Sequence, residues 1–219
     1  MPDRVDLRGK IKTVFKQSWN DCSANVISNV VQSLKDDGKV VSRLFQYYNS
    51  RFVSEPDFIT DNGATYRDAL KALQKFGFVN EEEWDYTDKH VNTSPSDEVY
   101  NSGLNNTYFI KSYRKLNQIL NNIKYTLFSG HLIMFGIAIW DNFIHLDANF
   151  VVPLPSKDNV LYGLHAVLMC GYDDDLQACL CVNSWGCDWG DHGFFYLPYK
   201  FILNEELAMD FWMIDTKLS

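Results

Sequence analysis

The hydrophobic pattern of this sequence changes near its middle, from a helical period to a strand period. After Asp21 the apolar residues follow the spacing of a helix with one buried side: Val26, Ile27, Val30, Val31 and Leu34. Further helices are predicted at 41–53 and 64–76, the second ended by Gly77. After a helix at 116–128, strands are predicted at 132–140, 166–172, 178–183, 193–197 and 211–214. Helices followed by strands indicate an α+β chain with two lobes.

The segment 88–106 has little periodicity and is rich in Ser, Asn, Asp, Pro and Gly. Such a composition is typical of a long connector, and we expect a lobe boundary there. Active sites often lie in the cleft between two lobes.

The composition and net charge of the chain exclude several classes of protein and of binding partner. Hydrophobic residues make up 46% of the chain and aromatic residues 15%, which excludes a disordered protein. The net charge is −8, and Lys and Arg never form a run longer than two, so we expect neither nucleic acid nor an anionic membrane as partner. The longest apolar run, 132–140, is too short for a membrane helix. The opening residues Met1-Pro2-Asp3-Arg4 do not resemble a signal peptide. We expect the protein to be a monomer.

The five cysteines are distributed unevenly. Cys22 stands alone, and the other four follow much later: Cys170, Cys179, Cys181 and Cys187. A disulfide framework would place even numbers of cysteines through the loops, so this pattern favours a reducing intracellular compartment. We expect that compartment to be the cytoplasm, or a virion or host cell if the source is viral. The abundance of Asn, Lys, Ile and Tyr is typical of AT-rich genomes, some large DNA viruses among them.

Cys22 lies at the predicted start of a helix, with Asp21 as the expected N-cap. A helix N-terminus favours the thiolate over the thiol, and the thiolate is the nucleophile. The alternative for a lone cysteine is a buried structural residue. Downstream, His165 opens an apolar strand and Asn183 begins a glycine- and tryptophan-rich segment, about 140 and 160 residues after Cys22. A thiolate needs an imidazole to exchange protons with, and the imidazole needs an acceptor that fixes its tautomer.

Six segments, spread over nearly the whole chain, resemble those of the papain-like cysteine peptidases (family C1, which includes the cathepsins). They are Pro2-Asp3-Arg4-Val5-Asp6-Leu7-Arg8, Val14-Phe15-Lys16-Gln17, Asp61-Asn62-Gly63-Ala64, Glu81-Glu82-Glu83-Trp84-Asp85-Tyr86, His165-Ala166-Val167-Leu168, and Asn183-Ser184-Trp185-Gly186 with Trp189, Gly190 and Gly193. The resemblance implies one papain-like domain over 1–219, with a helical lobe at about 10–105 and a β-barrel lobe at about 106–219. Whether the N-terminal segment crosses between the lobes stays open. The match is to the mature domain, so we expect no inhibitory propeptide in this chain.

The resemblance also assigns roles to individual residues. It implies Cys22 as nucleophile, His165 as general base and acid, and Asn183 as the residue that orients His165. Gln17 would donate to the oxyanion, together with the backbone N–H of Cys22. The substrate backbone would contact Gly63, Ala64 and the Leu164 carbonyl. Trp185 would shield the hydrogen bond between Asn183 and His165 from water.

The chain departs from the family pattern around Cys22. Four residues separate Gln17 from Cys22 where the family has five, and the usual Cys-Gly-Ser before the nucleophile is replaced. Asp21 places a carboxylate beside the nucleophile, so we expect a less acidic thiol than is usual in the family. Ala64 replaces a family glycine, which costs about 1 kcal/mol if the position is left-handed. The family's disulfide cysteines in the helical lobe are absent.

The leading hypothesis is therefore a cysteine endopeptidase that forms an acyl-enzyme and needs no cofactor. Its partners would be a polypeptide substrate and a protein inhibitor or propeptide acting in trans. The altered loop before Cys22 motivates the alternative, a papain-like binding or structural module with weak or no turnover. An isopeptidase, transglutaminase-like enzyme or amidase with the same Cys-His pair is a third hypothesis. A zinc site at Cys179-X-Cys181 with Cys187 and His192 is disfavoured, since strand alternation places Cys179 and Cys181 on one face as core residues. We expect all four of the later cysteines to be core residues.

Overall fold

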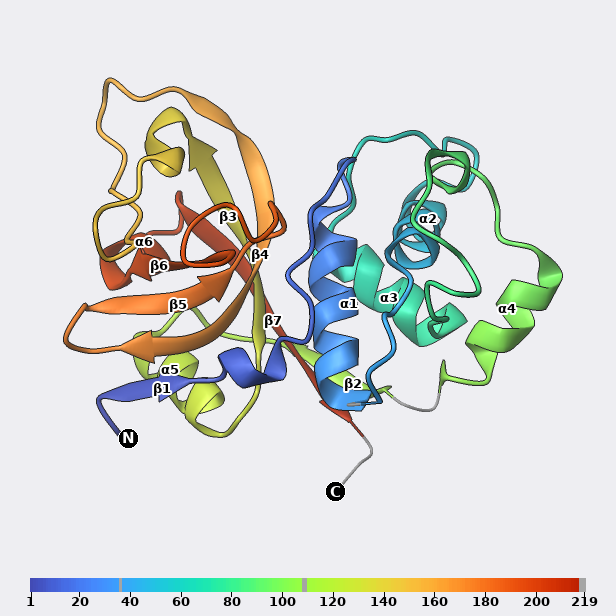
Figure 1. Ribbon diagram of the computed structural model, residues 1–219, viewed down its shortest axis with the longest axis horizontal. Helices are drawn as coiled ribbons and strands as arrows, with labels where there is room; N and C mark the ends of the chain where they lie inside the picture. The colour runs from blue at the N-terminus through green and yellow to red at the C-terminus, as the bar shows by residue number, and fades with distance from the viewer. Residues whose placement is uncertain (36, 108–109, 217–219) are drawn as a thin grey trace. The chain divides into compact units, whose positions relative to one another are not determined.

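The helical first half and the strand-rich second half of the chain form two compact units (Figure 1). The computed structural model describes residues 1–35, 37–107 and 110–216. The sheet unit comprises Met1–Lys10, Val14–Lys16 and Arg114–Met213, and the helical unit comprises Ile11–Thr13, Gln17–Tyr113 and Ile214–Ser219. The α+β fold class predicted from the sequence is confirmed.

The helical unit is built on α1 (Cys22–Lys35), α2 (Arg43–Ser54), α3 (Tyr66–Phe76) and α4 (Asp97–Leu104), with a short 3-10 helix at Asp88–His90. The helix α1 is buried on every side over 23–32, so the prediction of a single buried side was wrong. The polar residues on its other faces are Ser, Asn and Gln, which are small enough to be enclosed. One of them, Asn25, donates from Nδ2 to the Asp21 carbonyl.

Local capping explains where the next two helices begin and end. The hydroxyl of Ser42 accepts from the Phe45 N–H at the start of α2, and that of Thr65 accepts from the Asp68 N–H at the start of α3. Gly77 ends α3 with φ 68°. These boundaries confirm the two predicted helices to within two residues.

The segment 88–106 was predicted as a connector, but it contains α4. The hydroxyl of Ser96 caps this helix by accepting from the Val99 N–H, and Asp97 and Glu98 lie in the first turn, where the helix dipole favours negative charge. A short helix of this kind depends on its cap rather than on a long apolar stripe, which is why the periodicity did not reveal it.

The strands form a mainly antiparallel sheet in the order β2-β7-β3-β4-β5-β6, with β1 paired to β4, and most of their residues belong to the sheet unit. The strands are β1 (Arg4–Asp6), β2 (Ile110–Lys115), β3 (Ile133–Trp140), β4 (Leu161–Asp173), β5 (Ala178–Val182), β6 (Phe194–Pro198) and β7 (Ala208–Thr216). The helix α5 (Leu120–Phe128) is four residues shorter at its start than predicted, and the short α6 (Tyr199–Ile202) follows β6. The strands β1 and β2 were not predicted.

Three of the four clustered cysteines belong to the interior of the sheet unit. Cys170, Cys179 and Cys181 are fully buried, the last two in one core cluster with residues of β3, β4 and β6. Cys187 is exposed, so its prediction as a core residue was wrong. It follows the end of β5 and lies in the turn-rich segment before β6, where no strand holds it in the core.

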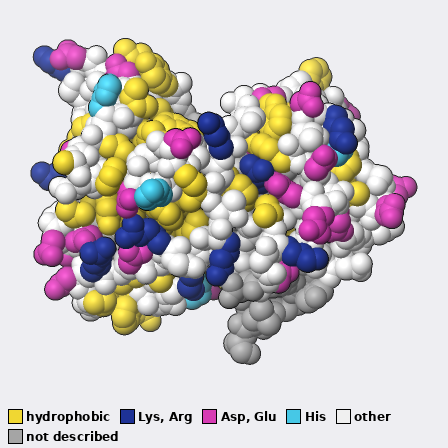
Figure 2. All heavy atoms as spheres, in the orientation of Figure 1, with side chains coloured by type: hydrophobic (Ala, Val, Ile, Leu, Met, Phe, Trp, Pro, Cys, Tyr) yellow, Lys and Arg dark blue, Asp and Glu magenta, His cyan; other side chains and the backbone are white. Residues whose placement is uncertain are grey.

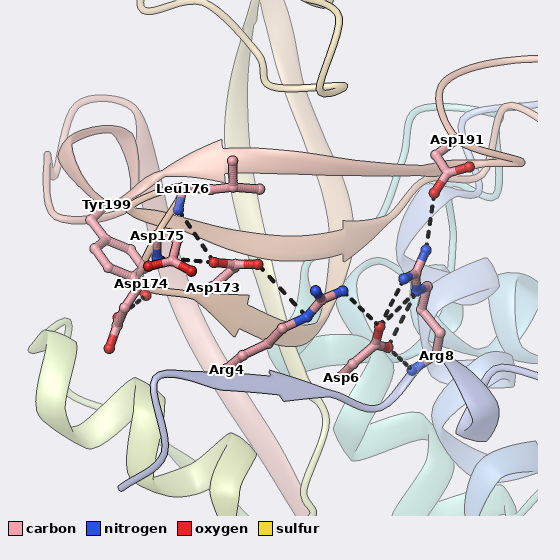
Figure 3. Close-up of polar contacts among 9 residues, drawn as sticks. All are labelled: Arg4, Asp6, Arg8, Asp173, Asp174, Asp175, Leu176, Asp191 and Tyr199. Atoms are coloured by element: carbon pink, nitrogen blue, oxygen red, sulfur yellow. Dashed lines mark hydrogen bonds and ion pairs between the residues drawn. The ribbon is translucent and has the colours of Figure 1, made fainter.

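Ion pairs connect the N-terminal residues Arg4 and Arg8 to other parts of the sheet unit (Figure 3). Arg4 forms an ion pair with Asp173 of β4 at 3.7 Å. Arg8 contacts both Asp6, at 2.8 Å, and Asp191, at 2.9 Å. The Arg8 guanidinium holds the pKa of the Asp6 carboxyl below its usual value, although burial opposes that shift. Together with the β1–β4 hydrogen bonds, these contacts tie the chain start to two separate parts of the sheet unit.

Hydrophobic side chains reach the surface of the sheet unit over a broad area (Figure 2). Four exposed hydrophobic residues lie close together in sequence, just before β4 and in its first residues: Val160, Leu161, Tyr162 and Leu164. None of the described helices is long and apolar enough to cross a membrane.

Candidate active site

Cys22 is the first residue of α1 and is half-buried. The N–H groups of a first helical turn have no partner within the helix, and the helix dipole adds a partial positive charge there. The local structure therefore provides the environment that favours a thiolate. No disulfide joins any of the five cysteines, all of which lie in the described part of the chain.

Asp21, directly before Cys22, is fully buried. Its Oδ2 accepts the Tyr86 hydroxyl at 2.8 Å, while Oδ1 has no hydrogen-bond partner within the described structure. Asp21 occupies the predicted N-cap position directly before α1, and its carbonyl accepts the Asn25 N–H at 3.0 Å, while its carboxylate is held by Tyr86. Burial raises the pKa of Asp21 above its usual value, and the Tyr86 hydroxyl and the Arg43 charge oppose the shift.

The loop between Gln17 and Cys22 is ordered by side chains rather than by glycines. The Gln17 Nε2 donates to the Trp19 carbonyl at 2.9 Å, and the Ser18 N–H donates to the Tyr86 hydroxyl at 3.0 Å. Tyr86 thus contacts both ends of the loop, since it also donates to Asp21. The indole of Trp19 packs edge-on against the Tyr86 ring, with centroids 4.7 Å apart.

The substrate-binding turn predicted at Gly63 and Ala64 also lies in the helical unit. Gly63 has φ 86°, a conformation that glycine adopts without strain. Ala64 does not have a positive φ, so its methyl group costs no backbone strain. The replacement of a family glycine at this position is therefore mild.

His165 and Asn183 lie together in the sheet unit, as the sequence predicted. His165 is in β4, Asn183 directly follows β5, and His165 Nε2 lies 2.8 Å from Asn183 Oδ1. The same Oδ1 accepts the Ser184 N–H at 2.8 Å, which identifies it as the amide oxygen. Because that oxygen only accepts, Nε2 carries the proton, and in the neutral ring Nδ1 holds the lone pair. His165 is buried, which lowers its pKa, whereas the Asn183 hydrogen bond raises it.

The glycines after Asn183 hold it in place. The Asn183 N–H donates to the Gly193 carbonyl at 2.9 Å, and the Gly193 N–H donates to the Trp189 carbonyl at 2.7 Å. Gly193 has φ 92°, and a Cβ there would lie 2.3 Å from Val14 Cγ1. The motif therefore needs glycine at 193 for both its backbone angle and its close packing.

Trp185 stacks beside His165, with ring centroids 5.4 Å apart. It also packs edge-on against Phe143 and Trp189, which fixes the indole in an aromatic cluster. Trp185 forms a β-bridge with Lys16, the residue before Gln17. Leu164, next to His165, is 70% exposed.

The sequence predictions thus fall into two groups. Cys22, Gln17, Gly63 and Ala64 lie in the helical unit, and His165, Asn183, Leu164 and Trp185 lie in the sheet unit. Sequence reasoning missed two side chains near Cys22. Tyr47 lies in the helix predicted at 41–53 and Asp61 in the segment Asp61-Asn62-Gly63-Ala64, but neither side chain was assigned a role from the sequence. Among the described residues, no group of three or more His, Cys, Asp or Glu is arranged to hold a metal ion.

Comparisons with known proteins show which family the chain belongs to. The model of the "Papain family cysteine protease" family matches residues 1–207. Xylellain, a cysteine protease from Xylella fastidiosa, is 33% identical with a TM-score of 0.90, over 99% of this chain and 87% of xylellain. The "Uncharacterized peptidase C1-like protein L477" of Acanthamoeba polyphaga mimivirus is 30% identical, over 96% of this chain and 71% of that protein.

More distant structures share the fold. Bromelain from Ananas comosus, solved with the inhibitor E64, is 18% identical with a TM-score of 0.75, over 98% of this chain and 99% of bromelain. At that identity the likeness extends to the two-lobed papain-like architecture only. Together with the family match over nearly the whole length, it identifies the fold predicted from the sequence. The chain belongs to the papain family of cysteine proteases and is a cysteine peptidase.

Proposed function

We propose that this peptidase is an endopeptidase that uses Cys22 as nucleophile and His165 as general base and acid. The observation that carries the proposal is the hydrogen bond of 2.8 Å between His165 Nε2 and Asn183 Oδ1. It fixes the tautomer in which Nδ1 can accept a proton, and burial favours the neutral ring. In the other unit, Cys22 lies where a helix start favours its thiolate.

The reaction would proceed by acyl transfer. His165 Nδ1 takes the proton of the Cys22 thiol, and the sulfur forms a bond to the carbonyl carbon of the scissile peptide. The resulting oxyanion accepts from the Gln17 side chain and the Cys22 N–H. When the C–N bond breaks, the departing amine takes the proton from His165. Water then gives a proton to His165 and attacks the thioester, which releases the acid and restores the thiol.

The substrate would be a polypeptide in extended conformation. Gly63 and Ala64 are proposed to lie along its backbone, and the exposed Leu164 would offer its carbonyl. Trp185 would exclude water from the hydrogen bond between His165 and Asn183, since its ring stacks on His165. A protein inhibitor or a propeptide acting in trans would occupy the same positions. We propose that the enzyme acts in a reducing compartment, on the grounds of its cysteine pattern. We also propose that it acts as a monomer.

Selective labelling of Cys22 tests the proposed nucleophile. E-64, the inhibitor bound to bromelain in its structure, should modify Cys22 much faster than the other four cysteines. The informative comparison is Cys187, because it is exposed, whereas burial raises the pKa of the thiols of Cys170, Cys179 and Cys181. Peptide mapping by mass spectrometry after a time course gives both rates. Equal modification of Cys22 and Cys187 would argue against Cys22 as nucleophile.

The buried Asp21 is expected to make the Cys22 thiol less acidic. Above the raised pKa of Asp21 the carboxylate is charged and opposes a neighbouring thiolate, so Asp21→Asn should lower the thiol pKa. We expect the pH profile of Cys22 alkylation by iodoacetamide to move by about one unit to lower pH. Asp37→Asn, beyond the far end of α1, is the matched control. Identical profiles for wild type and Asp21→Asn would sink the expectation.

A further inference from the structure

One carboxyl oxygen, Oδ1 of Asp61, accepts hydrogen bonds both from the loop before Cys22 and from the helix α2. The Oδ1 atom of Asp61 accepts the Asn20 N–H at 2.9 Å and the Tyr47 hydroxyl at 2.6 Å. A second bond runs from Asn20 Nδ2 to the Asp61 carbonyl, also at 2.9 Å. Asn20 is therefore held to Asp61 by its backbone and by its side chain.

The Tyr47 hydroxyl extends this contact to Gly63. It donates to Asp61 and accepts the Gly63 N–H at 3.0 Å. Tyr47 projects from α2, is fully buried, and has the Arg51 guanidinium 3.7 Å above its ring. Burial raises the pKa of the Tyr47 phenol, so the hydroxyl keeps the proton with which it donates. We call these four residues, Asn20, Tyr47, Asp61 and Gly63, the loop clamp.

We infer that Asp61 and Tyr47 are positioning residues, which hold the substrate-binding turn at Gly63 in register with the nucleophile. The inference rests on the proposed roles of Cys22 and Gly63. Asn20 lies two residues before Cys22 and Asp61 lies two residues before Gly63, so the clamp joins the two segments close to their functional residues. Neither Asp61 nor Tyr47 touches the reacting atoms; each acts through its hydrogen bonds.

The two residues affect different parts of the reaction. Without the Tyr47 hydroxyl, the Gly63 N–H loses its acceptor while Asn20 stays bound to Asp61. The turn then loosens and the nucleophile loop does not, so substrate binding is weakened more than the chemical step. Without the Asp61 side chain, both Asn20 and Tyr47 lose their shared acceptor. Misplacement of the loop beside Cys22 then slows the chemical step as well.

The test combines two pairs of variants of the full chain. Tyr47→Phe should raise KM for a peptide substrate about tenfold and change kcat less than about twofold. Tyr48→Phe is the matched control, because it also removes a tyrosine hydroxyl, one position along α2 and outside the loop clamp. This variant should behave as wild type. Asp61→Ala should lower kcat/KM about a hundredfold through both parameters. Asp61→Asn keeps an oxygen that can accept both bonds and should recover most of the loss.

Amide hydrogen exchange tests the clamp without any turnover. In Tyr47→Phe the Gly63 amide should exchange faster with the Asn20 amide unchanged, whereas in Asp61→Ala both should exchange faster. Unchanged exchange at Gly63 in Tyr47→Phe, or kinetics indistinguishable from those of Tyr48→Phe, would overturn the inference. If wild type cleaves no peptide, the proposed function fails, and the exchange rates still decide whether the clamp exists.

Discussion

Replacing Cys22 with alanine is expected to abolish peptide hydrolysis, lowering kcat by at least about ten-thousand-fold. The reason is chemical: an alanine cannot form the thioester, so the reaction loses its covalent route rather than one stabilising contact. The substitution should be tolerated structurally, because Cys22 is half-buried and alanine has the highest helix propensity. Cleavage of a peptide library, followed by mass spectrometry, measures the effect.

Cys187→Ala is the control for this substitution. Cys187 is exposed and lies in the other unit, so its replacement should leave the rate of cleavage unchanged. Cleavage that survives in Cys22→Ala would mean that another residue, or a contaminant, performs it. A folded wild-type protein that cleaves nothing in the library would favour the alternative hypothesis of a binding module with weak or no turnover. The altered loop before Cys22 is the feature that suggests this alternative.

The altered loop before Cys22 also shows which part of the site could not be predicted from the sequence. The His165–Asn183 pair was predictable, because each residue belongs to a dense local motif and the chemistry requires an acceptor for the imidazole. The function of Asp61 and Tyr47 was not. Their hydrogen bonds join residues far apart in the sequence, and a buried tyrosine at helical spacing has the same pattern whether its hydroxyl binds a loop or not.

The same distinction applies to the fold. The ends of α2 and α3 follow from Ser42, Thr65 and Gly77, which act within one turn of the chain, and sequence reasoning placed them closely. The strand β1 has three residues, and its identity depends on pairing with β4 and on the ion pair from Arg4 to Asp173. No local pattern encodes such partners. Short elements stabilised by distant contacts are therefore the ones that periodicity misses.

Asn183 offers the sharpest test of the proposed catalytic pair, because two substitutions should shift one pKa in opposite directions. In Asn183→Ala the buried His165 Nε2–H and the Ser184 N–H lose their shared acceptor. We expect kcat/KM to fall about a hundredfold, since an unpaired buried donor costs about 1–3 kcal/mol and the ring loses its orientation. The Asn183 hydrogen bond raises the pKa of His165, so its loss should lower that pKa further.

Asn183→Asp keeps an oxygen acceptor and adds a negative charge beside His165. The charge favours the imidazolium, so the pKa of His165 should rise. The limb of the pH profile of kcat/KM that titrates with His165 should therefore move to lower pH in Asn183→Ala and to higher pH in Asn183→Asp. Asn204→Ala is the matched control, because Asn204 also accepts a backbone N–H through Oδ1, in a turn before β7, and it should leave the profile unchanged. Shifts in the same direction in both Asn183 variants would mean that His165 does not titrate in the rate profile, and the proposed role of Asn183 would then fail.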